Sequence, residues 1–283
     1  MLEITKEKLV EILTKTQNAS KVEILELRTS PGSQKGDNYS CVLIAADFKA
    51  EIDGAAEEFH WMFKLPPDDI GRLAMLRGCH VEDKEIKMYV DAIPNFKRLI
   101  KERGANLEVN YPNCPYTELD LDDTNHPTNS ILVMENLTRS NYRDATNKKK
   151  GLGLSYAKVA MEEIAKHHAL GYAWIKESLG GSTELEQVKK GKFNLLTRDY
   201  FMSDQEDQVI EMFQTFENGL TDGFFDLMEA AEEQGQNFAN VLRDFHANQK
   251  NVMRLRDEIL RPKPNDFNTL CHGDFWFNNI LFR

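Results

Sequence analysis

The chain has few cysteines and no long apolar run, and each absence excludes a class of protein. No apolar run approaches the ~20 residues that span a bilayer, and the N-terminal residues lack the basic-then-apolar layout of a secretory signal. The four cysteines form no CxxC pair and no cluster with the spacing of metal ligands. These are Cys41, Cys79, Cys114 and Cys271. We therefore expect a cytoplasmic protein with reduced thiols and no membrane partner.

An excess of basic residues is also missing. The chain has 35 Lys and Arg against 46 Asp and Glu, which gives a formal net charge of -11. A nucleic-acid surface needs clustered Lys and Arg to neutralise phosphates, so we expect no nucleic-acid partner. A local basic run such as residues 148–150 fits a solvated loop. The remaining composition, 41% hydrophobic and 29% charged over 283 residues, is that of a globular protein with room for one large domain or two lobes.

The first part of the chain has the pattern of a helix followed by a sheet. Residues 5–16 carry apolar side chains at helical spacing, and Thr5 is a suitable N-cap. Residues 22–28 indicate a strand, but its apolar alternation changes phase between Ile24 and Leu25. Either a bulge or a strand covered on both sides explains that change.

The rest of the pattern predicts a small sheet and then helices. Strands are expected at 39–48 and 59–65, on either side of the hairpin signal Asp53-Gly54. Further elements are then expected in chain order: a helix over 74–90 that ends before Pro94, a short helix over 95–103, strands at 107–114 and 131–134, and helices from residue 155, over 209–233 and over 241–260. A sheet lobe, a connector and a helical lobe form the two-lobed plan of kinases, and we place their bounds at 1–134, 135–150 and 151–283.

The most specific motif is the run near the end of the sequence, where His-Gly-Asp is followed by an Asn five positions after Asp274. In kinase-type phosphoryl transfer, a loop Asp accepts the proton of the attacking hydroxyl and a later Asn holds a magnesium ion. The five-residue spacing favours Asn279 over its neighbour Asn278. Apolar residues at 269–271 and 280–282 indicate strands on both sides of this loop.

Three less specific features precede that motif in kinase order. A glycine-containing loop at 32–40 is either a simple turn or a nest of backbone amides for phosphate. Lys64 lies on a strand and either reaches nucleotide phosphates or ends in solvent. Glu85, on the following helix, either pairs with that lysine or belongs to an ordinary charged surface, and Glu82 and Asp83 are its rivals.

Together these residues resemble the ecdysteroid kinase-like (CHK kinase-like) family, which is related to choline kinases and aminoglycoside phosphotransferases. The matching segments, in order, are residues 31–40, 63–66, Glu85 with Tyr89 and Pro94, 134–137, 165–169 and 271–282. The resemblance implies an α+β, protein-kinase-like two-lobed fold, with an N-terminal antiparallel sheet lobe and a helical C-terminal lobe. It also implies ATP and Mg²⁺ as cofactors and a small-molecule alcohol, such as an ecdysteroid-type steroid, as substrate.

The resemblance further implies roles for single residues. Asp274 would be the catalytic base and Asn279 a magnesium ligand. Lys64 would contact the ATP phosphates, Glu85 would orient it, and residues 134–137 would form the hinge that holds adenine. The full set of implied nucleotide-binding positions is Gly36, Asn38, Lys64, Glu85, Met134, Glu135 and Leu137.

Some features separate this chain from its relatives or keep other functions open. Gly273 stands where protein kinases have an arginine, so control by a phosphorylated activation loop is not expected. Family members continue into an Asp-Phe-Gln-type segment and further helices, whereas this sequence ends at Arg283. Either an incomplete gene product or sequence, or a natural short form, would explain this, and we favour the first. In both cases we expect an incomplete C-terminal lobe and weak binding of Mg·ATP. The alternatives are a pseudokinase-like binding protein or inactive fragment, and a choline or aminoglycoside-type kinase. His167 and His168 are expected to be structural.

Overall fold

The computed structural model describes residues 3–33, 40–78, 80–119, 130–144, 151–197 and 267–283, with isolated positions between 215 and 259. The chain forms two compact units. The first comprises Met1–Arg77, Val81–Trp174 and Thr269–Arg283, and the second comprises Gly78–His80 and Ile175–Asn268. The candidate site lies wholly within the first unit. The fold is α+β, as predicted.

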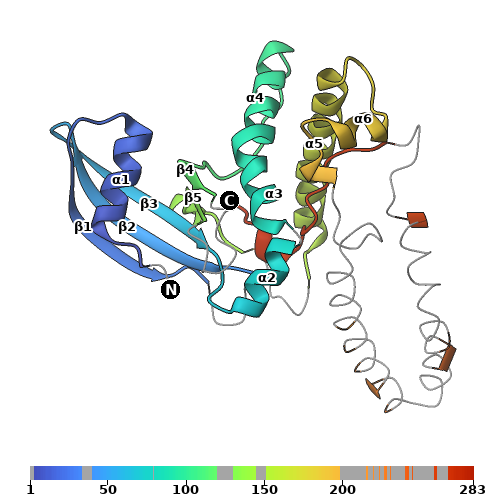
Figure 1. Cartoon of the computed structure of the whole chain (residues 1–283), viewed down its shortest axis with the longest axis horizontal. Helices are drawn as coiled ribbons and strands as arrows, with labels where there is room; N and C mark the ends of the chain where they lie inside the picture. The colour runs from blue at the N-terminus through green and yellow to red at the C-terminus, as the bar shows by residue number, and fades with distance from the viewer. Residues whose placement is uncertain are drawn as a thin grey trace. The chain divides into compact units, whose positions relative to one another are not determined.

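An antiparallel five-stranded sheet forms the N-terminal part of the first unit (Figure 1). Its strands are β1 (Val22–Pro31), β2 (Val42–Ile52), β3 (Ala55–Leu65), β4 (Tyr116–Glu118) and β5 (Ile131–Glu135). They lie in the order β1-β2-β3-β5-β4, and every neighbouring pair is antiparallel. The predicted sheet is confirmed, and it places β5 directly beside the strand that carries Lys64.

Two local signals in the sequence specify the register of this sheet. Asp53 (φ 49°) and Gly54 (φ 90°) both have positive φ and join β2 to β3. This is the backbone of a tight hairpin turn whose twist matches that of the strands. The pairing of β1 with β2 shifts between Ile24 and Glu26, so the predicted bulge is confirmed.

Helix α1 (Lys6–Gln17) covers one face of the sheet, as Figure 1 shows. The predicted N-cap is confirmed, because the Thr5 side chain accepts a hydrogen bond from the Lys8 amide at 3.3 Å. The apolar stripe of α1 is completely buried in one core with sheet residues. Its members include Leu9, Ile12 and Leu13 from the helix and Phe48, Trp61 and Phe63 from the strands.

The predicted helix over 74–90 is wrong in both its start and its end. Helix α2 (Ile70–Gly78) is separated from α3 (Val81–Lys87) by His80, whose φ is 54°. Helix α3 then continues through a π turn, η1 (Met88–Ala92), into α4 (Ile93–Glu102), in spite of Pro94. Proline lacks an amide donor and crowds the preceding turn of an α-helix. The wider π turn, in which the Ile93 amide bonds the Met88 carbonyl, lies just before Pro94, which falls within the first two positions of α4.

The predicted strand at 107–114 is also wrong, because this segment joins no ladder. It is instead held by scattered contacts to other elements. The Glu135 amide donates to the Asn113 carbonyl at 2.7 Å, and Lys166 Nζ donates to the Glu108 carbonyl at 3.0 Å. Apolar alternation alone does not make a strand, because the backbone groups of a strand must also pair in a ladder, and here they are bonded elsewhere.

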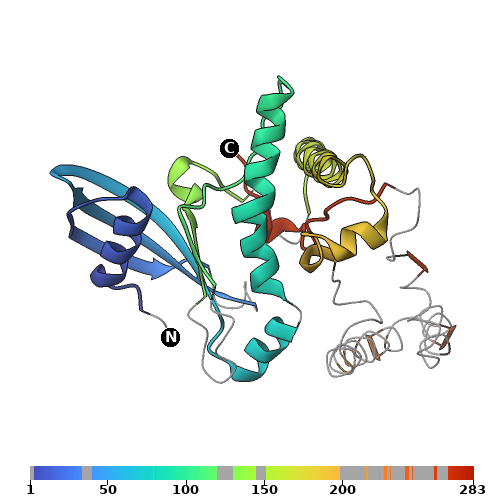
Figure 2. The same cartoon turned by 45° about the horizontal axis from the view of Figure 1, so that its top comes forward.

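Helix α5 (Leu154–Ser178) begins the expected helical part of the chain, and in the first unit it packs against α4 (Figures 1 and 2). The rings of Phe96 and Trp174, both completely buried, are 6.0 Å apart in an edge-to-face arrangement. In the second unit, α6 (Leu185–Lys190) and the 3₁₀ helix η3 (Leu195–Thr197) flank the buried Phe193. The helices expected over 209–233 and 241–260 lie outside the described residues. In the described part of the chain, none of the helices combines the length and apolar character needed to cross a membrane.

Candidate active site

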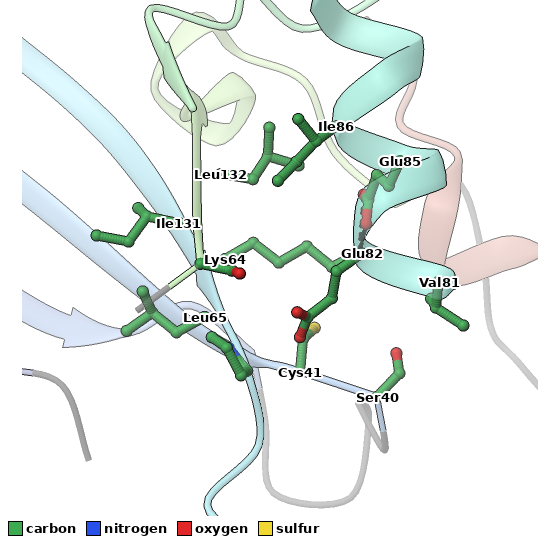
Figure 3. A pocket seen from close by; sticks show the side chains of 12 residues that line it. Ser40, Cys41, Lys64, Leu65, Val81, Glu82, Glu85, Ile86, Ile131 and Leu132 are labelled. Atoms are coloured by element: carbon green, nitrogen blue, oxygen red, sulfur yellow. Dashed lines mark hydrogen bonds and ion pairs between the residues drawn. The ribbon is translucent and has the colours of Figure 1, made fainter. Parts of the chain in front are cut away.

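The structure brings Lys64 and Glu85 together as an ion pair. Lys64 lies near the end of β3, and Glu85 lies on α3, which faces that strand end (Figure 3). The distances from Lys64 Nζ to the two carboxylate oxygens of Glu85 are 2.8 and 2.6 Å. Among the three carboxylates weighed in the sequence, Glu85 is the one whose pairing with Lys64 the structure gives. Glu82, one turn earlier on the same helix face, lines the adjoining pocket.

The surroundings of Lys64 keep its ammonium charged. Desolvation by the surrounding protein lowers the pKa of Lys64. The negative charge of Glu85 and, to a smaller extent, that of Asp274 act in the opposite direction and raise the pKa above its ordinary value. A charged ammonium is the form that binds phosphate. Asp274, in the terminal loop, thus contributes to the charge that acts on this lysine.

A pocket opens beside the ion pair, and Figure 3 shows its lining. One side is charged or polar and the other is apolar. The lining residues are Ser40, Cys41, Lys64, Leu65, Pro66, Val81, Glu82, Glu85, Ile86, Ser130, Ile131 and Leu132. Ser40 is the last residue of the glycine-containing loop and Cys41 follows it, and the sequence pattern assigned neither side chain a role of its own. Gly36 and Asn38 lie outside the described residues.

The loop around Asp274 has a backbone that only glycine adopts without strain. Gly273 has a φ of +80°, in the left-handed region. The Asp274 amide donates to His272 Nδ1 at 3.3 Å. Asn279 lies in the 3₁₀ helix η4 (Phe277–Asn279), and its side-chain amide donates to the Asp274 carbonyl at 2.8 Å and to Oδ2 at 2.9 Å. The five-residue spacing thus places the two side chains in direct contact.

Asn279 fits a magnesium ion that is shared with phosphates. Its amide nitrogen is bonded to Asp274, which leaves its amide oxygen as a hard donor for a metal and the other Asp274 carboxylate oxygen for an acceptor proton. Mg²⁺ prefers oxygen ligands, and it is commonly held by one or two protein groups together with substrate phosphates and water. Among the described residues, no group of three or more His, Cys, Asp or Glu side chains could hold a metal by itself. The donor set therefore suits a metal that arrives with a nucleotide.

The strands expected on both sides of this loop are not formed. The lead-in is held by helix α5, because Thr269 Oγ1 donates to the His168 carbonyl at 2.5 Å. On the other side there is only an isolated bridge, in which the Arg143 and Phe282 backbones exchange hydrogen bonds of 2.8 and 2.9 Å. The Phe282 ring also packs edge-on against Tyr156 at 4.9 Å. The loop is thus positioned by α5 and by the segment after β5.

His167 lies beneath the loop in a packed position. It is 5% exposed, and its Nδ1 is 2.7 Å from the Tyr111 hydroxyl. Its ring contacts those of Phe96 and His272, with centroids 5.8 and 6.5 Å away. Desolvation, and then the charge of neighbouring histidines, lowers the pKa of His167 to about 4. A buried imidazole in this position packs against the His272 ring of the loop and fits the structural role expected for it.

The segment expected to hold adenine leaves the sheet at the end of β5. The Tyr89 hydroxyl donates to Met134 Sδ at 3.3 Å, and the Ser140 hydroxyl donates to the Glu135 carboxylate at 3.0 Å. Leu137 begins the 3₁₀ helix η2 (Leu137–Ser140). Met134, Glu135 and Leu137 lie outside the lining of the pocket described above. Met134 and Glu135 lie on β5 together with Ile131 and Leu132, which do line the pocket. Leu137 comes two residues after the end of this strand.

A five-stranded antiparallel sheet, a strand–helix Lys–Glu pair and a loop with a paired Asp and Asn are the features of the protein-kinase-like fold. The sequence model of the ecdysteroid kinase-like family matches residues 35–283, and the chain belongs to this family. At the level of the family, this is a kinase-like small-molecule phosphotransferase. Searches among curated proteins and among solved structures gave no match.

Proposed function

We propose that this protein transfers the γ-phosphoryl group of ATP to a hydroxyl of a small molecule. The observation that carries the proposal is the Lys64–Glu85 ion pair, supported by the paired side chains of Asp274 and Asn279 in the terminal loop. A phosphoryl-transfer site needs one group that holds the donor phosphates and another that activates the acceptor hydroxyl. The Lys64 ammonium is suited to the first task and the Asp274 carboxylate to the second.

Each side chain has a definite task in this reaction. The acceptor oxygen forms a bond to the γ-phosphorus while the bond from that phosphorus to the bridging oxygen of ADP breaks. Asp274 takes the proton of the acceptor hydroxyl. Lys64 binds the phosphate oxygens as a point charge, and Glu85 fixes its position. Bound magnesium would neutralise charge on the β- and γ-phosphates, with Asn279 as its protein ligand.

The surroundings of Asp274 support an apolar acceptor. The next two residues, Phe275 and Trp276, are 38% and 47% exposed, so an aromatic surface lies beside the proposed base. Aromatic faces bury apolar surface of a ligand and form the lining that small-molecule sites commonly have. This favours an alcohol of the steroid type over the cationic acceptors of choline or aminoglycoside-type kinases. A substrate panel of sterol, choline and aminoglycoside alcohols distinguishes these classes.

The central test is phosphate transfer from ATP to that panel, together with an Asp274→Asn variant. Loss of the proposed base should lower kcat by about 100-fold or more, since general-base catalysis contributes ~10²–10⁴. Asn279→Ala should lower activity strongly, and the matched Asn278→Ala should lower it less. Where the gene encodes residues after Arg283, the assay includes that longer chain. Full activity in Asp274→Asn would show that Asp274 is not the general base.

The assay also separates an enzyme from a binding protein. Binding of Mg·ATP without transfer to any alcohol would show that the protein binds a nucleotide but is not a kinase.

A further inference from the structure

We propose that Asp47, His60 and Arg139 form a tether that holds the hinge, residues 134–137, against the sheet and so positions the nucleotide. This inference rests on the proposed function, because the hinge is the segment expected to hold adenine. The three residues lie outside the pocket and touch none of the catalytic side chains described above. They are therefore positioning residues, and sequence reasoning gave them no role.

The tether is centred on one carboxylate. Arg139, on η2 just after the hinge, donates from Nε to Asp47 Oδ1 at 3.1 Å and from Nη2 to Oδ2. Asp47 lies on β2, 92 positions earlier in the chain. On the neighbouring strand, His60 Nδ1 lies 2.7 Å from Asp47 Oδ1. Asp47 and His60 are direct partners in the β2–β3 register, so the sheet itself sets their distance.

A second contact ties the hinge to the same place on the sheet. The Asn136 amide donates to the His60 carbonyl at 2.9 Å. Asn136 is 3% exposed, and its side-chain oxygen accepts bonds from the Thr138 amide (3.2 Å) and hydroxyl (2.7 Å). This oxygen caps the 3₁₀ helix that carries Arg139. The hinge backbone is therefore fixed at Asn136 by β3 and, three residues later, through Arg139 by β2.

The geometry gives this cluster more weight than an ordinary surface ion pair. Isolated exposed pairs contribute little, but a two-pronged Arg–carboxylate contact within a network is an exception. The Arg139 guanidinium, and to a smaller extent His60, lowers the pKa of Asp47 despite some desolvation, so the carboxylate stays charged. Residues 134–137 are the segment proposed to hold adenine. A hinge that is held in place before binding loses less conformational freedom when the nucleotide arrives.

The tether itself is tested in the nucleotide-free chain by hydrogen exchange. Arg139→Gln should speed exchange of the amides at 134–142 by about fivefold, because local opening follows the lost contact. The charge-exchanged double variant, Asp47→Arg with Arg139→Asp, should restore slow exchange. Arg98→Gln is the matched control, since Arg98 pairs with Glu102 on α4 at 2.6 Å, away from the hinge. Unchanged exchange in Arg139→Gln would overturn the tether.

The link to the nucleotide is tested by calorimetry with Mg·ATP. Arg139→Gln should weaken binding by about fivefold, and the double variant should recover most of that loss. Because Arg139 touches no reacting group, KM for ATP should rise while kcat stays within about twofold of the parent. Equal affinity in parent and variant would overturn nucleotide positioning, although hinge exchange still reports on the tether. A parent that binds no Mg·ATP would overturn the proposed function, and nucleotide positioning with it.

Discussion

Gly273 links the backbone of the terminal loop to the chemistry proposed for it. A Cβ at this position would have no heavy atom within 4 Å, so space does not demand glycine. The φ of +80° does, because a side chain in the left-handed region clashes with its own backbone. The carbonyl and amide on either side set where Asp274 emerges. An arginine, which protein kinases have at this position, would be strained in this conformation.

Gly273→Ala is therefore expected to act through conformation alone. It should lower the free energy of unfolding by about 1 kcal/mol and lower phosphotransfer by moving Asp274. Gly54→Ala is the matched control, because Gly54 also has a positive φ and open space around its Cβ position but lies in the β2–β3 turn. Urea denaturation and a phosphotransfer assay report the two effects. Equal loss of activity in both variants would show that the effect of Gly273 is one of stability only.

Helix α5 positions the terminal loop through one close approach. Gly171 faces the lead-in so tightly that a Cβ built there would lie 2.8 Å from Thr269 Oγ1 and 3.1 Å from Leu270 Cβ and N. Two of these neighbours belong to Leu270, including its backbone, so the loop would have to move to admit a methyl group. The same lead-in is bonded to the carbonyl of His168, one turn earlier on α5. Helix α5 therefore fixes the position of Thr269 and Leu270, which lead into the loop that carries Asp274.

Gly171→Ala should displace the loop. We expect a loss of about 1–3 kcal/mol in the free energy of unfolding, as is usual for overpacking, together with reduced phosphotransfer. Gly71→Ala in α2 is the control. Its Cβ would make only an ordinary 3.5 Å contact with Asp69, and alanine favours the helix, so stability should hold or rise. If Gly171→Ala matched the parent in both thermal denaturation and activity, the loop would not depend on this contact.

The buried imidazole of His167 makes the stability of the folded chain depend on pH. The pKa of His167 is lowered from 6.5 to about 4 in the folded protein, chiefly by desolvation. As the pH falls below about 6.5, the unfolded chain takes up a proton that the folded chain refuses, so stability decreases. The decrease is complete only below about pH 4, where His167 is protonated in the folded chain as well. Its size is on the order of 3 kcal/mol, at 1.36 kcal/mol per pKa unit.

Urea denaturation between pH 7.5 and pH 4.5 measures this effect as a slope. His167→Gln removes the titrating group and keeps hydrogen-bonding capacity toward Tyr111, so its stability should fall less steeply with acid than that of the parent. The comparison uses the difference between the two slopes, because carboxylates contribute equally to both. Parallel slopes in parent and variant would show that the pKa of His167 is the same in the folded and the unfolded chain.

Local patterns in the sequence were sufficient for much of the fold. The Asp53-Gly54 turn, the Thr5 cap and the β1 bulge each follow from a few neighbouring residues, because backbone conformation and short-range hydrogen bonds decide them. Pro94 shows the limit of such patterns. The proline signal predicts the end of a helix, but a π turn carries the helix through, and α4 is then held by packing of Phe96 against Trp174.

The candidate site divides in the same way. The order of Lys64, Glu85, Asp274 and Asn279 along the chain was enough to select them as candidates, since chemistry restricts which residue types can serve. The tertiary structure was needed to show that Lys64 pairs with Glu85, for which Glu82 and Asp83 were rivals in the sequence. It was also needed to show that Arg139 contacts Asp47, 92 positions away in the chain. Sequence periodicity reports which face of an element is apolar. It does not report which charged groups meet, because that depends on the register of the sheet and the packing of helices that are distant in the chain.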